Sequence, residues 1–194
     1  MRRGAAGCER GGGRGRRTVI ECRIDRNWRV RAQSVVEVPL PASAVWGQMR
    51  DVQRFLTLDP LHVRVTPVGE RSGGWAGQEI VISHRLLGIG PDRRGRVLRW
   101  REGRGYAISD LSRRGDVRGV PHVCTSQVEA SGPERGQMTI GARGVWTARW
   151  LPRWAGRMWI WWVLRATDVR VQREMRAFAR WRRRAAGIRA GGTK

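Results

Sequence analysis

The chain has 194 residues, with 39 Lys and Arg against 16 Asp and Glu, which gives a formal net charge of +23 at pH 7. This length fits one domain with short extensions, and 40% hydrophobic residues with 11 tryptophans exclude a wholly disordered protein. All the basic residues except Lys194 are arginines, so a composition bias and a functional need for positive charge are both open explanations.

More than half of the excess charge lies at the two ends. Residues 1–32 carry ten arginines and three acids, and residues 180–194 carry six basic residues and no acid. The first 17 residues (MRRGAAGCERGGGRGRR) cannot bury enough apolar surface to fold by themselves. We therefore predict a basic, Gly/Arg-rich and largely disordered tail over residues 1–32, a folded domain over 33–180 and a basic tail over 181–194.

The cysteines and histidines limit the chemistry that we expect. Cys8, Cys22 and Cys124 form no CxxC pair and are odd in number, which argues against a disulfide framework and a zinc site. The three histidines show no HxH or HExxH spacing, so we expect no metal and no cofactor. No apolar signal segment follows the basic start, and the longest apolar run, 158–164, is far shorter than the ~20 residues that cross a membrane. We expect a cytoplasmic protein.

The folded part begins with a strand and two short helices. A strand is predicted at 34–38, and residues 18–24 are left open as a short strand or an extended lead-in. Residues 41–51 have proline and serine at a helix entrance and apolar residues at helical spacing, and a second helical piece follows at 52–58.

From residue 61 the hydrophobic period changes to two, which is typical of strands. Turn sequences such as ERSGG and SGPERG separate the segments. We predict an antiparallel meander of strands at 61–68, 77–87, 96–102, 106–112, 121–129 and 137–147.

After Pro152 the pattern becomes helical for roughly thirty residues, with arginines opposite one apolar stripe. The stripe consists of Ile160, Leu164, Thr167, Val171, Met175 and Phe178. A sheet must wrap this helix to bury the stripe. We therefore predict an α+β fold, in which an antiparallel sheet of six to seven strands wraps a long C-terminal helix and two short helices follow the first strand.

Three segments and the long closing helix carry a resemblance. The segments are VVEVPLPASAVWGQMRDVQRFLTLDP (35–60), AISDLSRRGDVRGVPHV (107–123) and RGVWTARWLPRW (143–154). They resemble the SRPBCC superfamily, the START-like helix-grip proteins that include polyketide cyclase/dehydratase-like proteins and birch-pollen-allergen-like ligand binders. The resemblance covers about residues 33–180, and residues 1–32 have no counterpart in it. It implies a cavity between sheet and helix for an apolar or amphipathic ligand, but no catalytic set, because catalytic residues differ between branches.

Strand alternation predicts which side chains face this cavity. His84 or His122 with Asp110 could act as general acid and base on a carbonyl-containing ligand, because imidazole titrates near neutral pH. Each can instead be satisfied by a backbone partner, and we favour that structural role. An enzyme of this kind would be polyketide cyclase/dehydratase-like. We expect the ligand to contact Ile80, Ile82, His84, Leu98, Trp100, Tyr106, Ile108, His122, Cys124, Ile140, Trp146, Ile160 and Leu164.

Six of the 11 tryptophans lie between Trp146 and Trp162, interleaved with arginines. This segment can form the core and the cavity rim, which we favour, or dock on an anionic membrane surface. The tails can bind nucleic acid without sequence preference. We predict that a monomer or homodimer binds a hydrophobic or aromatic, lipid- or polyketide-like molecule. The alternative is a peripheral membrane or polyanion-binding protein that uses the Trp/Arg segment and the tails.

Overall fold

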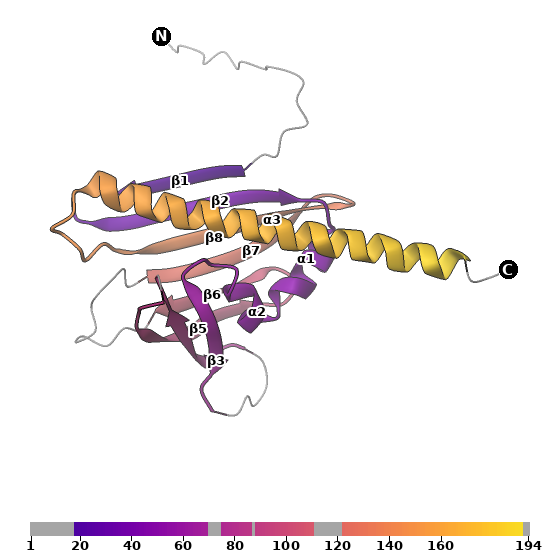
Figure 1. The fold of residues 1–194 in the computed structure, drawn as a ribbon, viewed down its shortest axis with the longest axis horizontal. Coiled ribbons are helices and arrows are strands. Elements are labelled where there is room, and N and C mark those ends of the chain that lie inside the picture. Colours follow the sequence, from indigo (N-terminus) through magenta and orange to yellow (C-terminus); the bar gives the residue numbers. More distant parts are fainter. Residues whose placement is uncertain (1–17, 70–74, 87, 111–121, 192–194) are drawn as a thin grey trace, which may run out of the picture.

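The structure is a computed structural model, and it describes residues 18–69, 75–86, 88–110 and 122–191. Within these residues, antiparallel strands form one sheet in the order β1-β2-β8-β7-β6-β5-β4-β3 (Figure 1). The strands are β1 (Thr18–Ile24), β2 (Arg29–Val38), β3 (His62–Pro67), β4 (Glu79–His84), β5 (Asp92–Arg101), β6 (Gly105–Asp110), β7 (His122–Gly132) and β8 (Arg135–Val145). The helices are α1 (Ala42–Met49), α2 (Val52–Leu56) and α3 (Arg153–Gly191).

The helices cover one face of the sheet. The long helix α3 packs against β1 and β2, α1 packs against β7 and β8, and α2 lies against β3 (Figure 1). The long helix and the two short helices therefore lie over different strands of the sheet. This confirms the predicted α+β fold, in which an antiparallel sheet wraps a long C-terminal helix.

The described sheet has eight strands rather than six to seven, because residues 18–24 form β1 instead of a lead-in. β1 pairs with β2 from Thr18 opposite Val36 to Ile24 opposite Val30. β2 begins at Arg29 and alternates buried and exposed residues along its length. Residues 18–32, which we had assigned to the basic tail, are thus part of the sheet, because their charged side chains can point to solvent while the alternate residues face inward. Residues 1–17 lie outside the described residues.

Helix α3 also runs beyond its predicted end. It has 39 residues and continues past residue 180, where we had placed the start of the C-terminal tail. Alanine and arginine are strong helix formers, and the sequence holds no proline after Pro152 to end the helix. This last part of α3 extends beyond the sheet (Figure 1). In the described part of the chain, no helix is long and apolar enough to cross a membrane.

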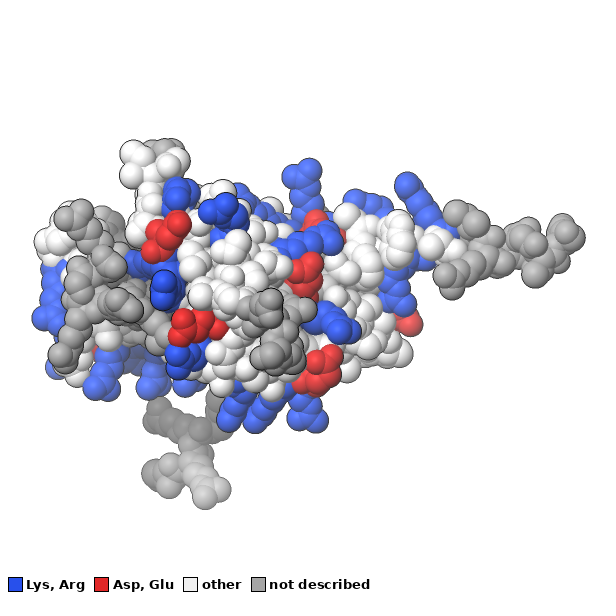
Figure 2. All heavy atoms as spheres, turned by 90° about the horizontal axis from the view of Figure 1, so that it is seen from below, with Lys and Arg blue, Asp and Glu red and all other residues white. Residues whose placement is uncertain are grey.

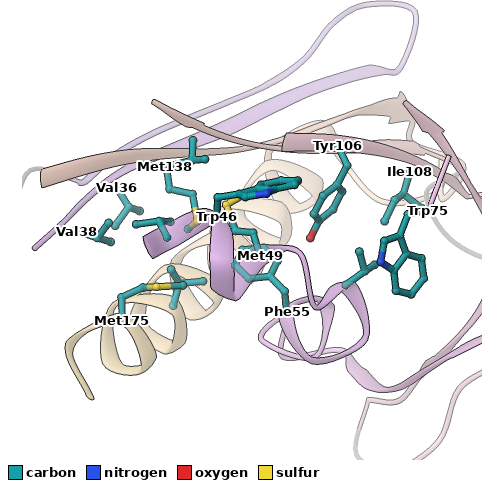
Figure 3. Packing of buried hydrophobic residues seen from close by; sticks show 14 of the residues in the cluster. Val36, Val38, Trp46, Met49, Phe55, Trp75, Tyr106, Ile108, Met138 and Met175 are labelled. Atoms are coloured by element: carbon teal, nitrogen blue, oxygen red, sulfur yellow. The ribbon is translucent and has the colours of Figure 1, made fainter. Parts of the chain in front are cut away.

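The buried residues form two clusters. The larger cluster lies beneath α1, α2 and the middle of α3, and contains Val36, Met49, Met138 and Met175, all 0% exposed (Figure 3). The smaller cluster lies where α3 begins and consists of Ile24, Val30, Ala32, Trp146 and Leu164.

Gly156 fixes the approach of α3 to this smaller cluster. A Cβ atom at this position would lie 2.8 Å from Cδ1 of Ile24 and 3.0 Å from Cε2 of Trp146. The first turn of α3 therefore lies this close to the sheet only because residue 156 has no side chain.

Candidate ligand-binding site

A pocket of about 20 Å³, enough for about one water molecule, lies between α2 and strands β3 to β7. All three histidines of the chain line it. The histidine pocket is formed by Leu56, His62, Ile82, His84, Arg93, Arg94, Gly95, Ile108, His122 and Cys124. It therefore combines an aliphatic floor with imidazole, thiol and guanidinium groups.

His62 and His84 are opposite partners on the antiparallel strands β3 and β4. Their ring centroids are 4.6 Å apart and the rings meet edge to face, at 86°. Nδ1 of His62 lies 2.9 Å from the carbonyl oxygen of Leu56, and Nδ1 of His84 lies 3.1 Å from that of Ile82. A carbonyl oxygen only accepts hydrogen bonds, so each Nδ1 carries a proton and donates it. In the neutral form of both rings, Nε2 is therefore the basic nitrogen.

His122 and Cys124 reach the pocket from β7, with β5 and β6 between them and His84. The structure thus brings together His84 and His122, two of the three catalytic candidates. The backbone of Asp110, the third, lies opposite Gly95 in the pairing of β5 with β6. The side chain of Asp110 lies outside the described residues, so its pairing with a histidine stays a prediction.

Sequence reasoning missed His62. This residue stands at the first position of β3, where alternation over residues 61–68 does not say which strand lies next to it. The register of β3 with β4 places His62 opposite His84. Register between strands is set by tertiary packing, which the local sequence does not show. The one signal for His62 in the sequence was its place near the end of a predicted strand.

The other predicted ligand contacts fall into separate groups. Ile82, Ile108 and Cys124 line the histidine pocket. The remaining sheet residues belong to or pack against the larger core cluster: Ile80, Trp100, Tyr106 and Ile140. The last three belong to or pack against the smaller cluster at the start of α3: Trp146, Ile160 and Leu164. A single cavity lined by all of these residues stays a prediction.

Leu98 does not face the interior, contrary to the prediction. Its side chain is 53% exposed, whereas Val97 is 0% exposed and Trp100 is half-buried. The pairing of β5 with β6 shifts between Val97 and Arg99. This bulge turns two consecutive residues outward, and strict alternation through the strand fails there.

An aromatic cluster lies on the inner face of β5 and β6. The rings of Trp100 and Tyr106 are stacked at 5.6 Å and 7°, and Trp46 and Trp75 lie 5.0 and 6.4 Å from Trp100. Glu102 accepts hydrogen bonds from the indole nitrogens of both Trp46 and Trp100, each at 2.9 Å. These two hydrogen bonds lower the pKa of Glu102. The carboxylate therefore holds the two indoles of the cluster in fixed orientations.

Tyr106 is the polar member of this cluster. Its side chain is 4% exposed, and burial raises its pKa far above the usual value, with a smaller lowering by the nearby Ser126 hydroxyl. The phenol therefore stays protonated at any physiological pH.

A buried carboxyl group lies at the seam between α3 and the sheet. Asp168 of α3 and Ser34 of β2 are both 0% exposed, and the serine hydroxyl donates a hydrogen bond of 2.5 Å to Oδ2 of Asp168. Oδ1 has no hydrogen-bond partner among the described residues. Burial raises the pKa of Asp168, and the bond from Ser34 offsets part of this rise. The signal was present in the sequence, because residue 168 falls on the buried stripe of α3, four residues after Leu164.

The Trp/Arg segment is only in part the core and rim that we favoured. Trp146 is 6% exposed and packs in the smaller cluster. The other five tryptophans of the segment are 36–83% exposed: Trp150, Trp154, Trp159, Trp161 and Trp162. The apolar stripe predicted for α3 does not include Trp159, Trp161 or Trp162, so helical periodicity already turned these three away from the sheet.

Comparison with solved structures shows the same fold in several proteins. An aromatase/cyclase from Streptomyces sp. R1128 superposes with a TM-score of 0.61 at 20% identity, over 82% of this chain and 98% of that one. A START superfamily protein from Mycobacterium smegmatis superposes with a TM-score of 0.55 at 12% identity, over 74% of this chain and 97% of that one. The di-domain ARO/CYC of the steffimycin biosynthetic pathway gives a TM-score of 0.63 at 12% identity, over 81% of this chain and 52% of that one.

No family model matches the chain, and no curated protein matches it. The structural likenesses bear out the resemblance to START-like helix-grip proteins at the level of the fold.

Proposed function

We propose that this protein binds a hydrophobic or aromatic small molecule at the histidine pocket. The observation that supports this most is that His62, His84 and His122 all line one pocket together with the aliphatic side chains of Ile82 and Ile108. Small-molecule sites are typically apolar with a few placed polar groups that orient the ligand. A ring or chain would lie on the aliphatic floor, and a hydroxyl of the ligand would donate a hydrogen bond to Nε2 of His62 or His84.

The similar structures suggest the chemical class of this ligand. Two of them are named as an aromatase/cyclase or an ARO/CYC, and a third as a START superfamily protein. A polyketide-like compound, with aromatic rings and several hydroxyl and carbonyl oxygens, has both the apolar surface and the polar groups that the pocket would take.

The pocket must enlarge to admit such a ligand, because its volume of about 20 Å³ holds about one water molecule. Arg94 at its edge is exposed. A long exposed side chain can change rotamer within nanoseconds. We propose that movement of side chains at this edge opens the space above Ile82 and Ile108.

Cyclisation or dehydration would further require groups that move a proton. His84 and His122 are suited to this, because a neutral imidazole accepts a proton near pH 7. The hydrogen bond from Nδ1 of His84 to a backbone carbonyl leaves Nε2 as the nitrogen that would do so. Asp110 is the carboxylate that we predict to orient one of these rings.

Two measurements test ligand binding. Native mass spectrometry of the purified protein should show a co-purifying small molecule, and the neutral aromatic probe N-phenyl-1-naphthylamine should bind saturably. Cys124→Phe fills the pocket and should weaken probe binding at least tenfold, whereas Leu98→Ala, on the exposed bulge of β5, should leave it unchanged. No co-purifying molecule together with no saturable probe binding would refute the proposal, and so would equal binding by Cys124→Phe and wild type.

A further inference from the structure

The outer side of α3 has a feature that ligand binding does not use. Four apolar side chains lie on one stripe of its first three turns and are 43–62% exposed: Trp154, Met158, Trp161 and Trp162. Trp150, in the turn before the helix, is 83% exposed. Exposed apolar residues gathered in one place mark a surface that contacts a partner or a membrane. We call these five residues the tryptophan face.

The same stripe continues into a basic groove. A groove of about 500 Å³ runs between α3 and β1, the edge strand of the sheet. It contains four arginines and no acid, and is lined by Thr18, Ile20, Trp161, Arg165, Val169, Gln172, Arg173, Arg176 and Arg180. Gln172 donates a hydrogen bond to Thr18 at 2.9 Å and accepts one from Arg176 at 2.9 Å, which fixes the floor of the groove. We call it the arginine groove.

Helical geometry shows that the face and the groove form one surface. With about 100° per residue, the positions from Trp154 to Arg180 that belong to either feature fall within about 120° of the helix circumference. The stripe that contains Leu164, Val171 and Met175, centred about 120° around the helix from this surface, is buried against the sheet. Trp154 and Arg180 are 26 residues apart, so the surface is about 39 Å long.

The charge of α3 makes this surface complementary to an anionic partner. Residues 153–191 contain eleven arginines and two acids. Both acids are engaged away from the groove, since Asp168 is buried with Ser34 and Glu174 forms an ion pair with Arg54. On the face seen in Figure 2, basic side chains are more frequent than acidic ones. Along the outer stripe of α3, the apolar groups lie in the first turns and the arginines of the groove follow them.

We propose that this stripe binds the surface of an anionic lipid bilayer, with α3 lying parallel to the membrane plane. Indole side chains favour the boundary between headgroups and acyl chains, and guanidinium groups bind lipid phosphates. A bilayer is flat over more than the length of the stripe and offers an apolar layer to Met158 and the indoles. A single-stranded nucleic acid would instead be matched by aromatic and basic groups that alternate along one groove.

Vesicle flotation tests the proposal with the full chain. Wild-type protein should float with vesicles of phosphatidylcholine and phosphatidylserine at 3:1, should not float with pure phosphatidylcholine, and should be released as salt is raised. The variant Trp154→Ala/Trp161→Ala/Trp162→Ala should lose this binding. Arg165→Gln/Arg173→Gln/Arg180→Gln should weaken it by roughly fivefold for each arginine.

Two matched controls separate the stripe from general charge and hydrophobicity. Arg99→Gln/Arg101→Gln/Arg104→Gln removes the same charge from exposed arginines of the β5–β6 hairpin. Trp181→Ala removes a tryptophan of α3 that is 61% exposed but lies about 200° around the helix from Trp161. Both controls should bind vesicles like wild type.

Several outcomes would overturn the proposal. These are no flotation of wild type, equal losses in the stripe variants and the controls, or binding of a single-stranded RNA that depends on the stripe when vesicle binding does not. If circular dichroism shows that the triple tryptophan variant is unfolded, wild-type protein is tested instead with vesicles whose lipids carry brominated acyl chains. Quenching of tryptophan fluorescence supports insertion of the indoles, and its absence refutes it.

Discussion

Asp168 provides the sharpest test of the helix–sheet seam. The carboxyl group is 0% exposed, receives one hydrogen bond from Ser34, and has one oxygen without a partner among the described residues. Taking a carboxylate out of water costs several kcal/mol, and one hydrogen bond to a charged group returns only about 1.5–3 kcal/mol. Ionisation of Asp168 therefore lowers the stability of the folded protein. Asp168→Asn replaces the carboxyl group by a neutral amide of nearly the same shape.

The sign of the pH dependence follows from the raised pKa. In the unfolded chain Asp168 loses its proton near its usual value of 3.8, whereas burial makes the folded protein retain the proton to higher pH. Between these two pKa values the folded state binds one more proton, so Asp168 lowers the free energy of unfolding by about 1.4 kcal/mol for each pH unit. Its stabilising contribution is complete below pH 3.8 and is lost as the pH rises through the folded pKa.

Urea denaturation of wild type and Asp168→Asn, followed by tryptophan fluorescence from pH 4 to 8, measures this difference. We expect the stability of Asp168→Asn relative to wild type to increase as the pH rises. Ser34→Ala removes the hydrogen bond that stabilises the ionised form of Asp168. In this background the rise in the relative stability of Asp168→Asn should continue to higher pH. Glu129→Gln, at an exposed carboxylate, should parallel wild type. A relative stability of Asp168→Asn that is flat over the whole range would show that Asp168 is not buried as an ionisable group.

Three further changes test the packing of the fold. Gly156→Ala should lower the free energy of unfolding by about 1–3 kcal/mol, because the new methyl group overpacks the cluster. The higher helix propensity of alanine offsets at most about 1 kcal/mol of this loss. Gly47→Ala in α1, with no atom within 4 Å of the new methyl, should instead raise the melting temperature. Ile80→Ala should cost about 2–5 kcal/mol in chemical denaturation, whereas Leu98→Ala should stay within about 0.5 kcal/mol of wild type, and similar losses would contradict the bulge in β5. The two indole hydrogen bonds lower the pKa of Glu102, so the tryptophan fluorescence of wild type should stay constant as the pH falls through 4.5 and should change only at a lower pH. Glu102→Gln should show no such transition.

Much of the fold follows from local pattern. The two short helices, the meander and the start of the long closing helix were all predicted within a few residues of their observed bounds, because periods of two and of three to four are properties of consecutive residues. The extra strand and the longer helix are errors at the ends of elements. There, high arginine content suggested a solvated tail, although arginine is compatible with the outer face of β1 and with a helix.

The site was less predictable. Alternation correctly placed Ile82, Ile108 and Cys124 with two histidines on one side of the sheet, and all five line the histidine pocket. It could not indicate that β3 brings a third histidine, since this depends on the register of β3 with β4. Nor could it indicate the bulge that exposes Leu98, because a bulge is defined by the partner strand.

The sequence by itself determined the class of fold, the apolar face of the regular strands and the charge that any partner must tolerate, because these depend on composition and on neighbours along the chain. The tertiary structure decided which groups meet. It set the histidines of β3, β4 and β7 around one pocket, placed Asp168 against Ser34, and turned a stripe of tryptophans and arginines outward. Each of these depends on strand register or on the rotation of α3, and both are settled by packing between segments that lie far apart in the chain.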